Sequence, residues 1–460
     1  MRVIPEKNLS APAYGWTIVV TSLAFVVAQL DVSIVNIALP QIADTYKVDI
    51  SVLQWIVDGY TLAFAVLMLS AGNLSDLFGA RRLFQLGMLI FGVASVACGL
   101  ATSALFLIIA RVFQGVGAAT MIPSSLAILN QTFADMPGKR AKAIGLWTAA
   151  GSAAIAAGPI VGGILINISN WRYIFFINAP LCLAGIVLTF LLQKQNSPTL
   201  VRKFDLAGQF AWMLSITLLI AAVIEWSKLG FSHPLIYGSI LLGGLSFVAF
   251  LIIEKKVSHP MLPLNLFNSA SFNVLLLLGA VLNGFYYGTV FILSLYLQNI
   301  LNYPPLTAGL AFLPLTAGFV ISNLASGSVI NRYGIRKPIL IGLTVFALGF
   351  SGLFTAGMHT SFWQLSVPFL LISLGMGLAV PAMTNGILSS VDKTLSGTAS
   401  ATLNTVRQAA GAIGVAVFGA IAANGGDAIL HTITISITGA ILCTLLIIFL
   451  SRKYVKSGTS

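Results

Sequence analysis

The chain has 460 residues, of which 58% are hydrophobic and only 8% are charged, and its mean hydropathy is +0.97. A soluble domain carries charges on about a quarter of its residues, so this composition excludes a soluble protein and indicates one that lies within a bilayer. The formal net charge is +12, but the placement of the basic residues points to membrane topology and not to nucleic-acid binding.

Long apolar stretches follow one another along the chain. A transmembrane helix needs about 20 apolar residues, and only helices or closed barrels satisfy every backbone polar group in lipid. The stretches do not alternate strictly between apolar and polar residues, so we expect helices. Fourteen are expected, at residues 14–38, 53–72, 83–101, 104–131, 142–168, 172–193, 206–226, 234–254, 270–299, 305–330, 338–357, 362–388, 397–423 and 431–451. The first is too long for the core of a cleaved signal peptide.

The basic residues predict the orientation of these helices. If the N-terminus is cytoplasmic, nineteen Lys and Arg residues lie in cytoplasmic loops and tails, and only Lys47, Arg172 and Lys228 lie on the opposite side. Cytoplasmic loops of membrane proteins carry such an excess of Lys and Arg. We therefore expect both termini to be cytoplasmic.

Two segments resemble each other and indicate an internal repeat. Residues 72–82 read "GNLSDLFGARR" and residues 327–337 read "GSVINRYGIRK". Eight expected helices lie between them where two six-helix repeats would place six, so two helices are extra, and polar stretches flank residues 206–254. The expected organisation is a tail (1–13), an N-terminal six-helix bundle (14–193), a linker (194–205), two inserted helices (206–254), a linker (255–269), a C-terminal six-helix bundle (270–451) and a tail (452–460), with the linkers and tails in the cytoplasm.

Five motifs follow one another along the first six expected helices. They are "LDVSIVNIALP" (30–40) in the first expected helix, "GNLSDLFGARR" (72–82) after the second, "IIARVFQGVGAA" (108–119) in the fourth, "GSAAIAAGPIVGGIL" (151–165) in the fifth and "NWRYIFFINAP" (170–180) at the sixth. In this order they resemble the motifs of the major facilitator superfamily, in its fourteen-span drug:proton antiporter branch. The resemblance implies an all-α, two-bundle membrane fold with 14 transmembrane helices (6 + 2 inserted + 6) in the bacterial inner membrane.

The resemblance also implies a function. We expect a proton-coupled exporter of amphipathic small molecules or drugs that works as a monomer by alternating access. A dedicated exporter of one endogenous metabolite or siderophore and an uptake carrier stay open as alternatives, and a membrane-embedded enzyme or a channel is less favoured. The sequence has no phosphate-binding Gly-rich motif with Lys-Ser/Thr and no His-Glu-x-x-His pattern. We therefore expect the proton motive force as the energy source, with no cofactor, no metal and no nucleic acid.

Three charges within the expected helices are candidates for proton coupling. Asp31 lies about 22 Å along the first helix, where a charge costs about 2.5–3.5 kcal/mol on insertion scales. A water path that opens and closes can switch whether such a carboxylate holds a proton, and the resemblance implies this role for Asp31 and Arg111. The alternative for Asp31 is a carboxylate neutralised in a structural ion pair, and the alternative for Arg111 is a structural anchor for contacts of the fourth helix. Asp58 is shallower, so partial solvation is the alternative there.

Glycine-rich segments predict two regions with a role in gating. In the fifth helix Gly151, Gly158, Gly162 and Gly163 expose backbone to a neighbouring helix, and Pro159 bends the helix. We interpret this helix as a gating seam, with ordinary small-residue packing as the alternative.

The loop after the second helix is the other region. We expect it to form a cytoplasmic latch in which Asp76 pairs with a loop arginine or accepts from a helix N-terminus of the other bundle. The residues of this latch are Gly72, Asp76, Gly79, Arg81 and Arg82.

Substrate contacts are expected to come from both halves. The candidates for the wall of a substrate cavity are Asn36, Tyr286, Tyr287, Arg407 and Gln408. Structure and coupling stay open as other roles for Arg407. After Glu254 the only acidic residues are Asp392 and Asp427, so we do not expect dications to be transported. Glu225 is interpreted as an interfacial, solvated residue.

Overall fold

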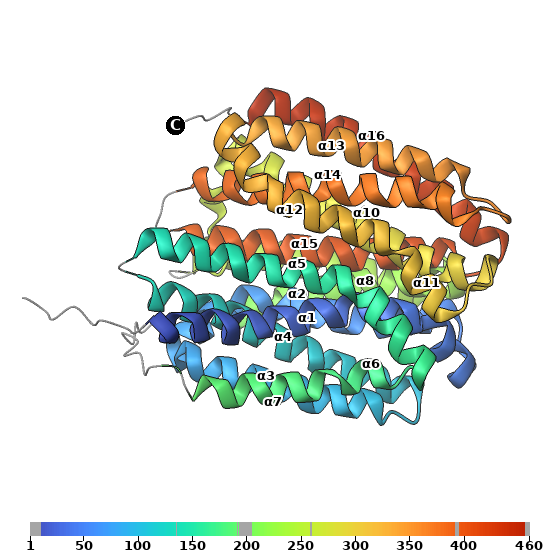
Figure 1. The fold of residues 1–460 in the computed structure, drawn as a ribbon, viewed down its shortest axis with the longest axis horizontal. Coiled ribbons are helices and arrows are strands. Elements are labelled where there is room, and N and C mark those ends of the chain that lie inside the picture. Colours follow the sequence, from blue (N-terminus) through green and yellow to red (C-terminus); the bar gives the residue numbers. More distant parts are fainter. Residues whose placement is uncertain are drawn as a thin grey trace, which may run out of the picture.

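The structure is a computed structural model that describes residues 11–134, 136–190, 192, 205–257, 260–391 and 395–455. Every regular element within these residues is a helix, and the long helices run roughly side by side (Figure 1). The α-helices are α1 (Ala11–Tyr46), α2 (Ile50–Phe78), α3 (Ala80–Gly99), α4 (Ala104–Thr132), α5 (Pro137–Ile168), α6 (Tyr173–Phe176), α7 (Asn178–Thr189), α8 (Leu206–Leu229), α9 (Pro234–Lys256), α10 (Ala270–Leu295), α11 (Pro305–Ala311), α12 (Leu313–Tyr333), α13 (Arg336–Gly352), α14 (Phe362–Ser389), α15 (Ser396–Ile421) and α16 (Asp427–Tyr454).

The helices are those of a membrane protein. Among the described residues, eleven spans are long and apolar enough to cross a bilayer, and α5 makes a twelfth if its two bent parts are taken together. The pair α6–α7 is a shorter apolar stretch, and α15 carries the polar residues Asn404, Arg407 and Gln408. The expected all-α membrane architecture is confirmed, while the count of fourteen spans stays a prediction.

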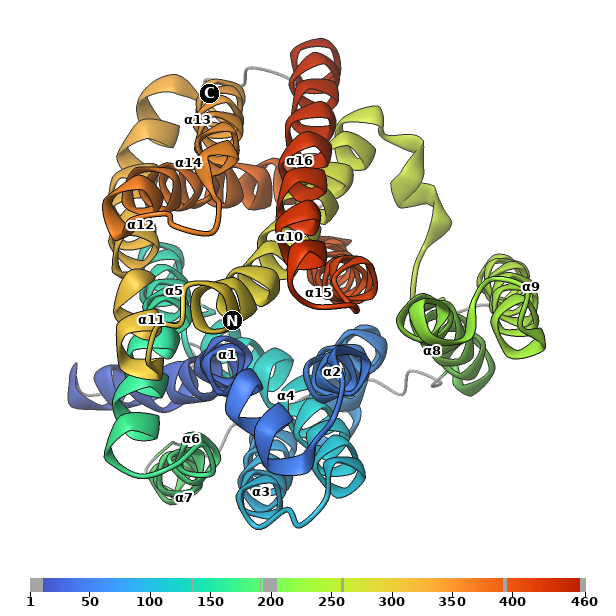
Figure 2. The ribbon, with the colours of Figure 1, turned by 90° about the vertical axis from the view of Figure 1, so that its right-hand side faces the viewer.

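Viewed along the helices, the chain forms two groups with a helix pair beside them (Figure 2). In the first group α1 packs on α5, and α4 packs on both α2 and α3. In the second, α10 packs on α15, and α14 packs on both α12 and α13. The groups meet where α2 contacts α15 and where α5 contacts α11 and α12. The start of α1 and the end of α16 lie at the same end of the molecule (Figure 1).

Two expected spans are each broken into two helices. The segment expected at 172–193 divides at Ile177 into α6 and α7, and the one at 305–330 divides at Phe312 into α11 and α12. A proline follows each break, Pro180 and Pro314, and proline cannot donate a backbone hydrogen bond within a helix.

The α5 helix also departs from a straight rod. It bends by 43° between Lys142–Ile155 and Ala157–Ile168. Pro159 leaves the carbonyl of Ile155 without its helical donor, as expected from the sequence.

The two repeated loop segments share one backbone feature. Gly79 ends α2 with φ +86°, and Gly334 ends α12 with φ +71°. These values lie in the region that only glycine adopts readily, so both segments use the same residue to end a helix and start the next one.

The helix pair α8–α9 is attached to the rest of the molecule through contacts of α8 with α2 and α15. Trp55 Nε1 donates to Glu225 Oε1 at 2.7 Å, and Gln209 Nε2 donates to the Val66 carbonyl at 3.0 Å. Glu225 therefore has a protein partner in addition to any interfacial water. The helix α8 also packs on α15, so the pair lies against both groups. The expected domain boundaries stay a prediction, and residues 194–204 of the first linker lie outside the described residues.

The helices α10 and α15 approach each other so closely at Gly288 that a Cβ atom does not fit there. A Cβ on Gly288 would lie 2.6 Å from both the Gly414 carbonyl oxygen and a Phe418 ring carbon, whereas a Cβ on Gly244 of α9 would meet nothing within 4 Å. Overpacking costs about 1–3 kcal/mol. We expect Gly288→Ala to lower the melting temperature of the detergent-solubilised protein and the control Gly244→Ala to leave it unchanged or slightly higher. Equal melting temperatures would contradict this packing.

Candidate functional site

A buried ion pair joins α1 and α4. Arg111 Nη1 donates to Asp31 Oδ2, and the two side chains are 1% and 0% exposed. The other salt bridge in the described part of the chain, between Lys228 and Asp49, is about half exposed. The two residues that the sequence singled out are therefore in contact.

Three further side chains complete the network around this pair. Asp31 Oδ1 accepts from Asn178 Nδ2 at 2.9 Å and from Gln114 Nε2 at 3.2 Å. Gln114 Nε2 also donates to Ser95 Oγ at 2.6 Å, and its Oε1 accepts from Arg111 Nη1 at 2.8 Å. The network thus draws its members from α1, α3, α4 and α7.

Arg111 is held on its other side as well. Its Nε donates to the Ile56 carbonyl at 3.0 Å, and its guanidinium lies 4.5 Å from the centre of the Tyr60 ring. The buried guanidinium therefore has a carboxylate, a backbone carbonyl and an aromatic face as its partners. Breaking the pair would leave both charges in apolar surroundings.

All described contacts of the Asp31 side chain use it as an acceptor, from Arg111, Gln114 and Asn178. A protonated carboxyl group carries a donor in addition. Protonation of Asp31 would remove the negative charge of this carboxylate and so weaken its attraction for Arg111 on α4.

Sequence reasoning found the pair but missed its partners. Gln114 stands three residues after Arg111, so both lie on one face of a helix, and that spacing could have identified it. Asn178 and Ser95 have no comparable signal, because their helices meet the pair only in the folded structure.

The structure does not join Asp58 to this network. Asp58 is fully buried, and neither carboxylate oxygen has a hydrogen-bond partner in the described part of the chain. It lies one helical turn from Gln54, which donates to the Ala416 carbonyl of α15 at 2.6 Å, and one turn from Leu62, which packs with α8 and α15 residues. Asp58 therefore belongs to the interface of α2 with α8 and α15.

The glycines of α5 face two different neighbours. Gly158 lies against Ser33 and the backbone of Ile34, and Gly162 also lies against Ile34, while Gly151 lies against the Phe25 ring. These three residues pack α5 on α1, which is in the same group.

The other two seam residues, Gly163 and Pro159, contact the second group. A Cβ on Gly163 would lie 2.8 Å from the Pro305 carbonyl oxygen, and Gly309 of α11 lies against the Pro159 carbonyl. Part of the predicted seam is therefore within one group and part is between the two.

The predicted latch residues lie around the end of α2 and the start of α3. Gly72 and Asp76 are in α2, and their side-chain positions lie outside the described residues. Arg81 donates to the Leu192 carbonyl at 3.1 Å and lies over the Phe190 ring, so it holds the chain that follows α7. Arg82 is exposed.

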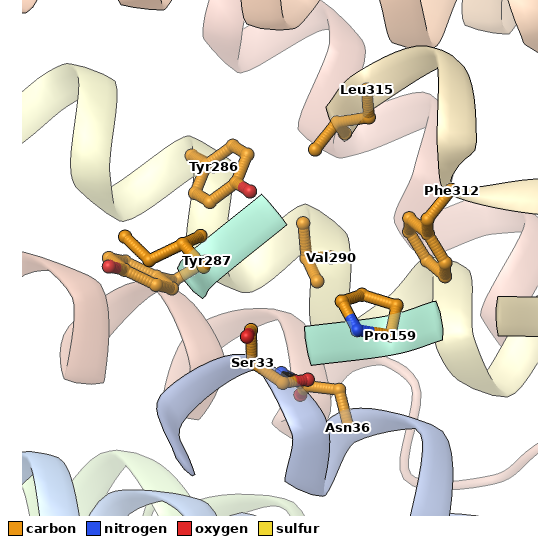
Figure 3. Close-up of a pocket in the computed structure, with 9 residues that line it drawn as sticks. Ser33, Asn36, Pro159, Tyr286, Tyr287, Val290, Phe312 and Leu315 are labelled. Atoms are coloured by element: carbon orange, nitrogen blue, oxygen red, sulfur yellow. Dashed lines mark hydrogen bonds between the residues drawn. The ribbon is translucent and has the colours of Figure 1, made fainter. Parts of the chain in front are cut away.

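Two narrow adjoining spaces lie between the groups, and Asn36 and Tyr287 border both. Tyr286 and Pro159 line the first, which Figure 3 shows, and Gln408 lines the second. Four of the five predicted cavity residues, all except Arg407, thus line one or both of these spaces. The remaining lining residues are Ser33, Ile155, Val290, Phe312 and Leu315 in the first space and Val32, Val57, Thr61, Gly411 and Val415 in the second.

The fifth predicted cavity residue, Arg407, precedes Gln408 in α15. It is only partly buried although it lies eleven residues from the start of that helix. No group of three or more His, Cys, Asp or Glu side chains suited to a metal ion occurs among the described residues.

The sequence matches the family described as Major Facilitator Superfamily over residues 21–415. The chain is 34% identical to the methylenomycin A resistance protein of Bacillus subtilis over 88% of its own length and 86% of that protein. It is also 34% identical to the multidrug resistance protein Stp of Mycobacterium tuberculosis (88% and 75% covered). Identity to the tetracenomycin C resistance and export protein of Streptomyces glaucescens is 32% (91% and 79% covered).

Solved structures share the fold. A crystal structure of a mutant of the nucleoside transporter NupG aligns with a TM-score of 0.64 at 12% identity, covering 96% of this chain and all of that one. A POT family transporter in complex with 5-aminolevulinic acid aligns with a TM-score of 0.69 at 15% identity, covering 95% and 96%.

The ion pair predicts a strongly non-additive pair of substitutions. Asp31→Asn leaves the Arg111 cation buried without its counter-charge, which costs about 3–5 kcal/mol. Thermal unfolding in detergent should show a large loss of stability for Asp31→Asn and for Arg111→Gln, and a smaller loss for the double variant than for their sum. Additive losses would contradict a direct interaction between the two side chains.

Proposed function

The chain belongs to the major facilitator superfamily, and we propose that it exports amphipathic small molecules or drugs from the cell in exchange for protons. Its relatives include drug and antibiotic resistance proteins from bacteria. The expectation of a transporter and not an enzyme is confirmed by the family, and so is a multi-pass protein of the bacterial inner membrane.

The observation that carries the proposed coupling is the buried Asp31–Arg111 pair. Asp31 precedes the cavity residues Ser33 and Asn36 on the same helix, so a change at the carboxylate reaches the space between the groups through α1. A proton on Asp31 removes its negative charge and weakens its attraction for Arg111. We infer that proton binding and release at this pair bias the positions of α1, α4 and α7.

The contacts between the groups support alternating access. Gln54 binds backbone carbonyls of α15, Ser294 Oγ donates to the Asn36 carbonyl at 2.5 Å, and Gln298 Nε2 donates to the Ile37 carbonyl at 3.1 Å. These hydrogen bonds lie toward the end where α1 turns into α2. In the proposed topology this end is periplasmic, so this conformation is closed to the outside and substrate release requires these bonds to break.

We further propose fourteen spans with both termini in the cytoplasm. In this arrangement α6–α7 and α11–α12 each count as one broken span and α15 crosses despite its polar residues. The α1 start and the α16 end lie at one end of the molecule (Figure 1), which supports an even number of crossings. The two six-helix bundles would then be α1–α7 and α10–α16, with α8–α9 inserted. The α5 seam and the loop latch would act as the gates of the cycle.

A narrow substrate range is the second candidate. Two of the relatives are named for a single compound, methylenomycin A and tetracenomycin C, while another is named a multidrug resistance protein. The spaces between the groups are narrow, which favours one or a few compounds. A dedicated exporter would share the coupling machinery proposed above and differ only in the cavity.

Proton exchange can be measured in inverted membrane vesicles with an inside-acid gradient. We expect some members of a panel of lipophilic acids, cations and neutral drugs to dissipate the gradient with the natural protein and not with Asp31→Asn. The reason is that proton release into the exchange cycle requires a titratable group at this position.

The matched control is Asp44→Asn, which removes an exposed carboxylate near the end of the same helix and should leave dissipation unchanged. Equal dissipation by Asp31→Asn and the natural protein would remove Asp31 from the coupling mechanism. If no compound acts although the protein is folded and inserted, the proposal of broad drug export fails and a dedicated exporter remains.

A further inference from the structure

We propose that the cavity binds the anionic group of its substrate at Arg407, so that the preferred substrates are amphipathic monoanions such as carboxylates or phenolates. This proposal rests on the proposed export function and specifies its substrate class.

Among the residues that the structure describes, none supplies a counter-charge to Arg407. Its one described hydrogen bond, from Nη1 to Asn404 Oδ1, is 3.5 Å long, and its buried Nε has no partner. No carboxylate lies within ion-pair distance of it among the described residues. After Glu254 the sequence has only two acidic residues, Asp392 and Asp427. Asp427 begins α16, beyond the far end of α15, and Asp392 precedes the start of α15.

The carboxylates of the first group do not supply the missing charge. Asp31 is bound to Arg111. Asp58 lies on the face of α2 that packs with α8 and α15 residues, and it makes no described contact with Arg407. A cation in a membrane interior must face a partner or water, so the charge of Arg407 is available to a ligand.

The position of Arg407 connects it to the cavity. Gly411, one turn further along α15, lines the second space together with Gln408, and residues four apart share a helix face. The ring of Tyr287, which borders both spaces, lies against Gly411. The aliphatic part of the Arg407 side chain packs against Gly279 of α10. Arg407 itself lines neither space, but it lies near enough to Tyr287, which borders both, for the two groups to interact electrostatically.

The rest of the wall suits an amphipathic molecule. No acidic or basic residue lines either space, and Arg407 directly precedes Gln408 of the second space. The rings of Tyr286, Tyr287 and Phe312 offer aromatic surface (Figure 3). Buried Gln408 Oε1 and Asn36 Oδ1 have no partner in the described part of the chain, so these two oxygens can accept a hydrogen bond from a bound ligand. An apolar body with one negative group matches this set, and a dication does not.

The test compares three ligands with one ring system: 2-naphthylacetate, its uncharged methyl ester, and 2-naphthylmethyl-trimethylammonium. Their binding to the purified protein is followed by naphthyl fluorescence anisotropy. A charge-assisted hydrogen bond contributes about 1.5–3 kcal/mol, so we expect the carboxylate to bind about ten- to a hundredfold more tightly than the ester. The trimethylammonium compound should bind more weakly than both.

Substitutions assign this preference to the residue. Arg407→Gln should bind carboxylate and ester equally, Arg407→Lys should retain most of the preference, and Arg332→Gln, which changes an exposed arginine of α12, should behave as the natural protein. Ester binding by Arg407→Gln reports that the variant is folded. If that variant does not fold, the natural protein and Arg407→Lys still decide the question.

The proposal is overturned if the natural protein binds the ester or the cation as tightly as the carboxylate, or if Arg407→Gln keeps the preference. Failure of the export function has a different signature. In that case none of the three ligands, nor any drug of the panel, dissipates a proton gradient in vesicles, whatever their order of binding.

Discussion

The buried Asp31–Arg111 pair is the constraint on which the arrangement of α1, α2, α3, α4 and α7 depends. A charge in the membrane interior is stable only with a partner, and each member of this pair has several. Because those partners come from these five helices, the network fixes how the helices sit relative to one another. In the proposed cycle, a proton on Asp31 would weaken a contact that several helices share.

Contacts within and between the two groups of helices overlap in kind. Within a group, the helices pack through glycines against backbone, as α10 and α15 do at Gly288 and Gly414. Between groups, glycine packing at Gly163 and Gly309 is accompanied by hydrogen bonds from side chains to backbone carbonyls, as from Gln54 to α15 and from Gln298 to α1. The proposed rocking of two bundles would have to separate both kinds of contact between the groups.

The sequence predicted the parts of this structure that local chemistry determines. The apolar runs located the helices, and the lone charges Asp31 and Arg111 identified the centre of the network, because an intramembrane charge is conspicuous in any apolar run. Asn178 could not be predicted in this way, since an amide in a helix is unremarkable until the fold places it 2.9 Å from a carboxylate. The position of Asp58 likewise depends on which face of α2 meets α8, and that rotation is set by tertiary packing. The breaks at Ile177 and Phe312 could have been predicted from the prolines that follow them.

Arg111 and Arg407, both within helices, together define how charge would move in the proposed cycle. Arg111 is neutralised within the first group, whereas Arg407 in the second group has no counter-charge in the described structure, so a bound monoanion brings the central region back to balance. Export of that anion in exchange for one proton moves two elementary charges in the direction favoured by an inside-negative potential. Each charge gains about 2.3 kcal/mol per 100 mV, so this exchange gains about 4.6 kcal/mol from a potential of that size, equivalent to roughly a thousandfold concentration ratio. Exchange of a monocation for one proton gains nothing from the potential, and a dication would move against it. A cavity with an unpaired cation beside it and no acidic lining therefore selects the substrates whose export the membrane potential drives most strongly.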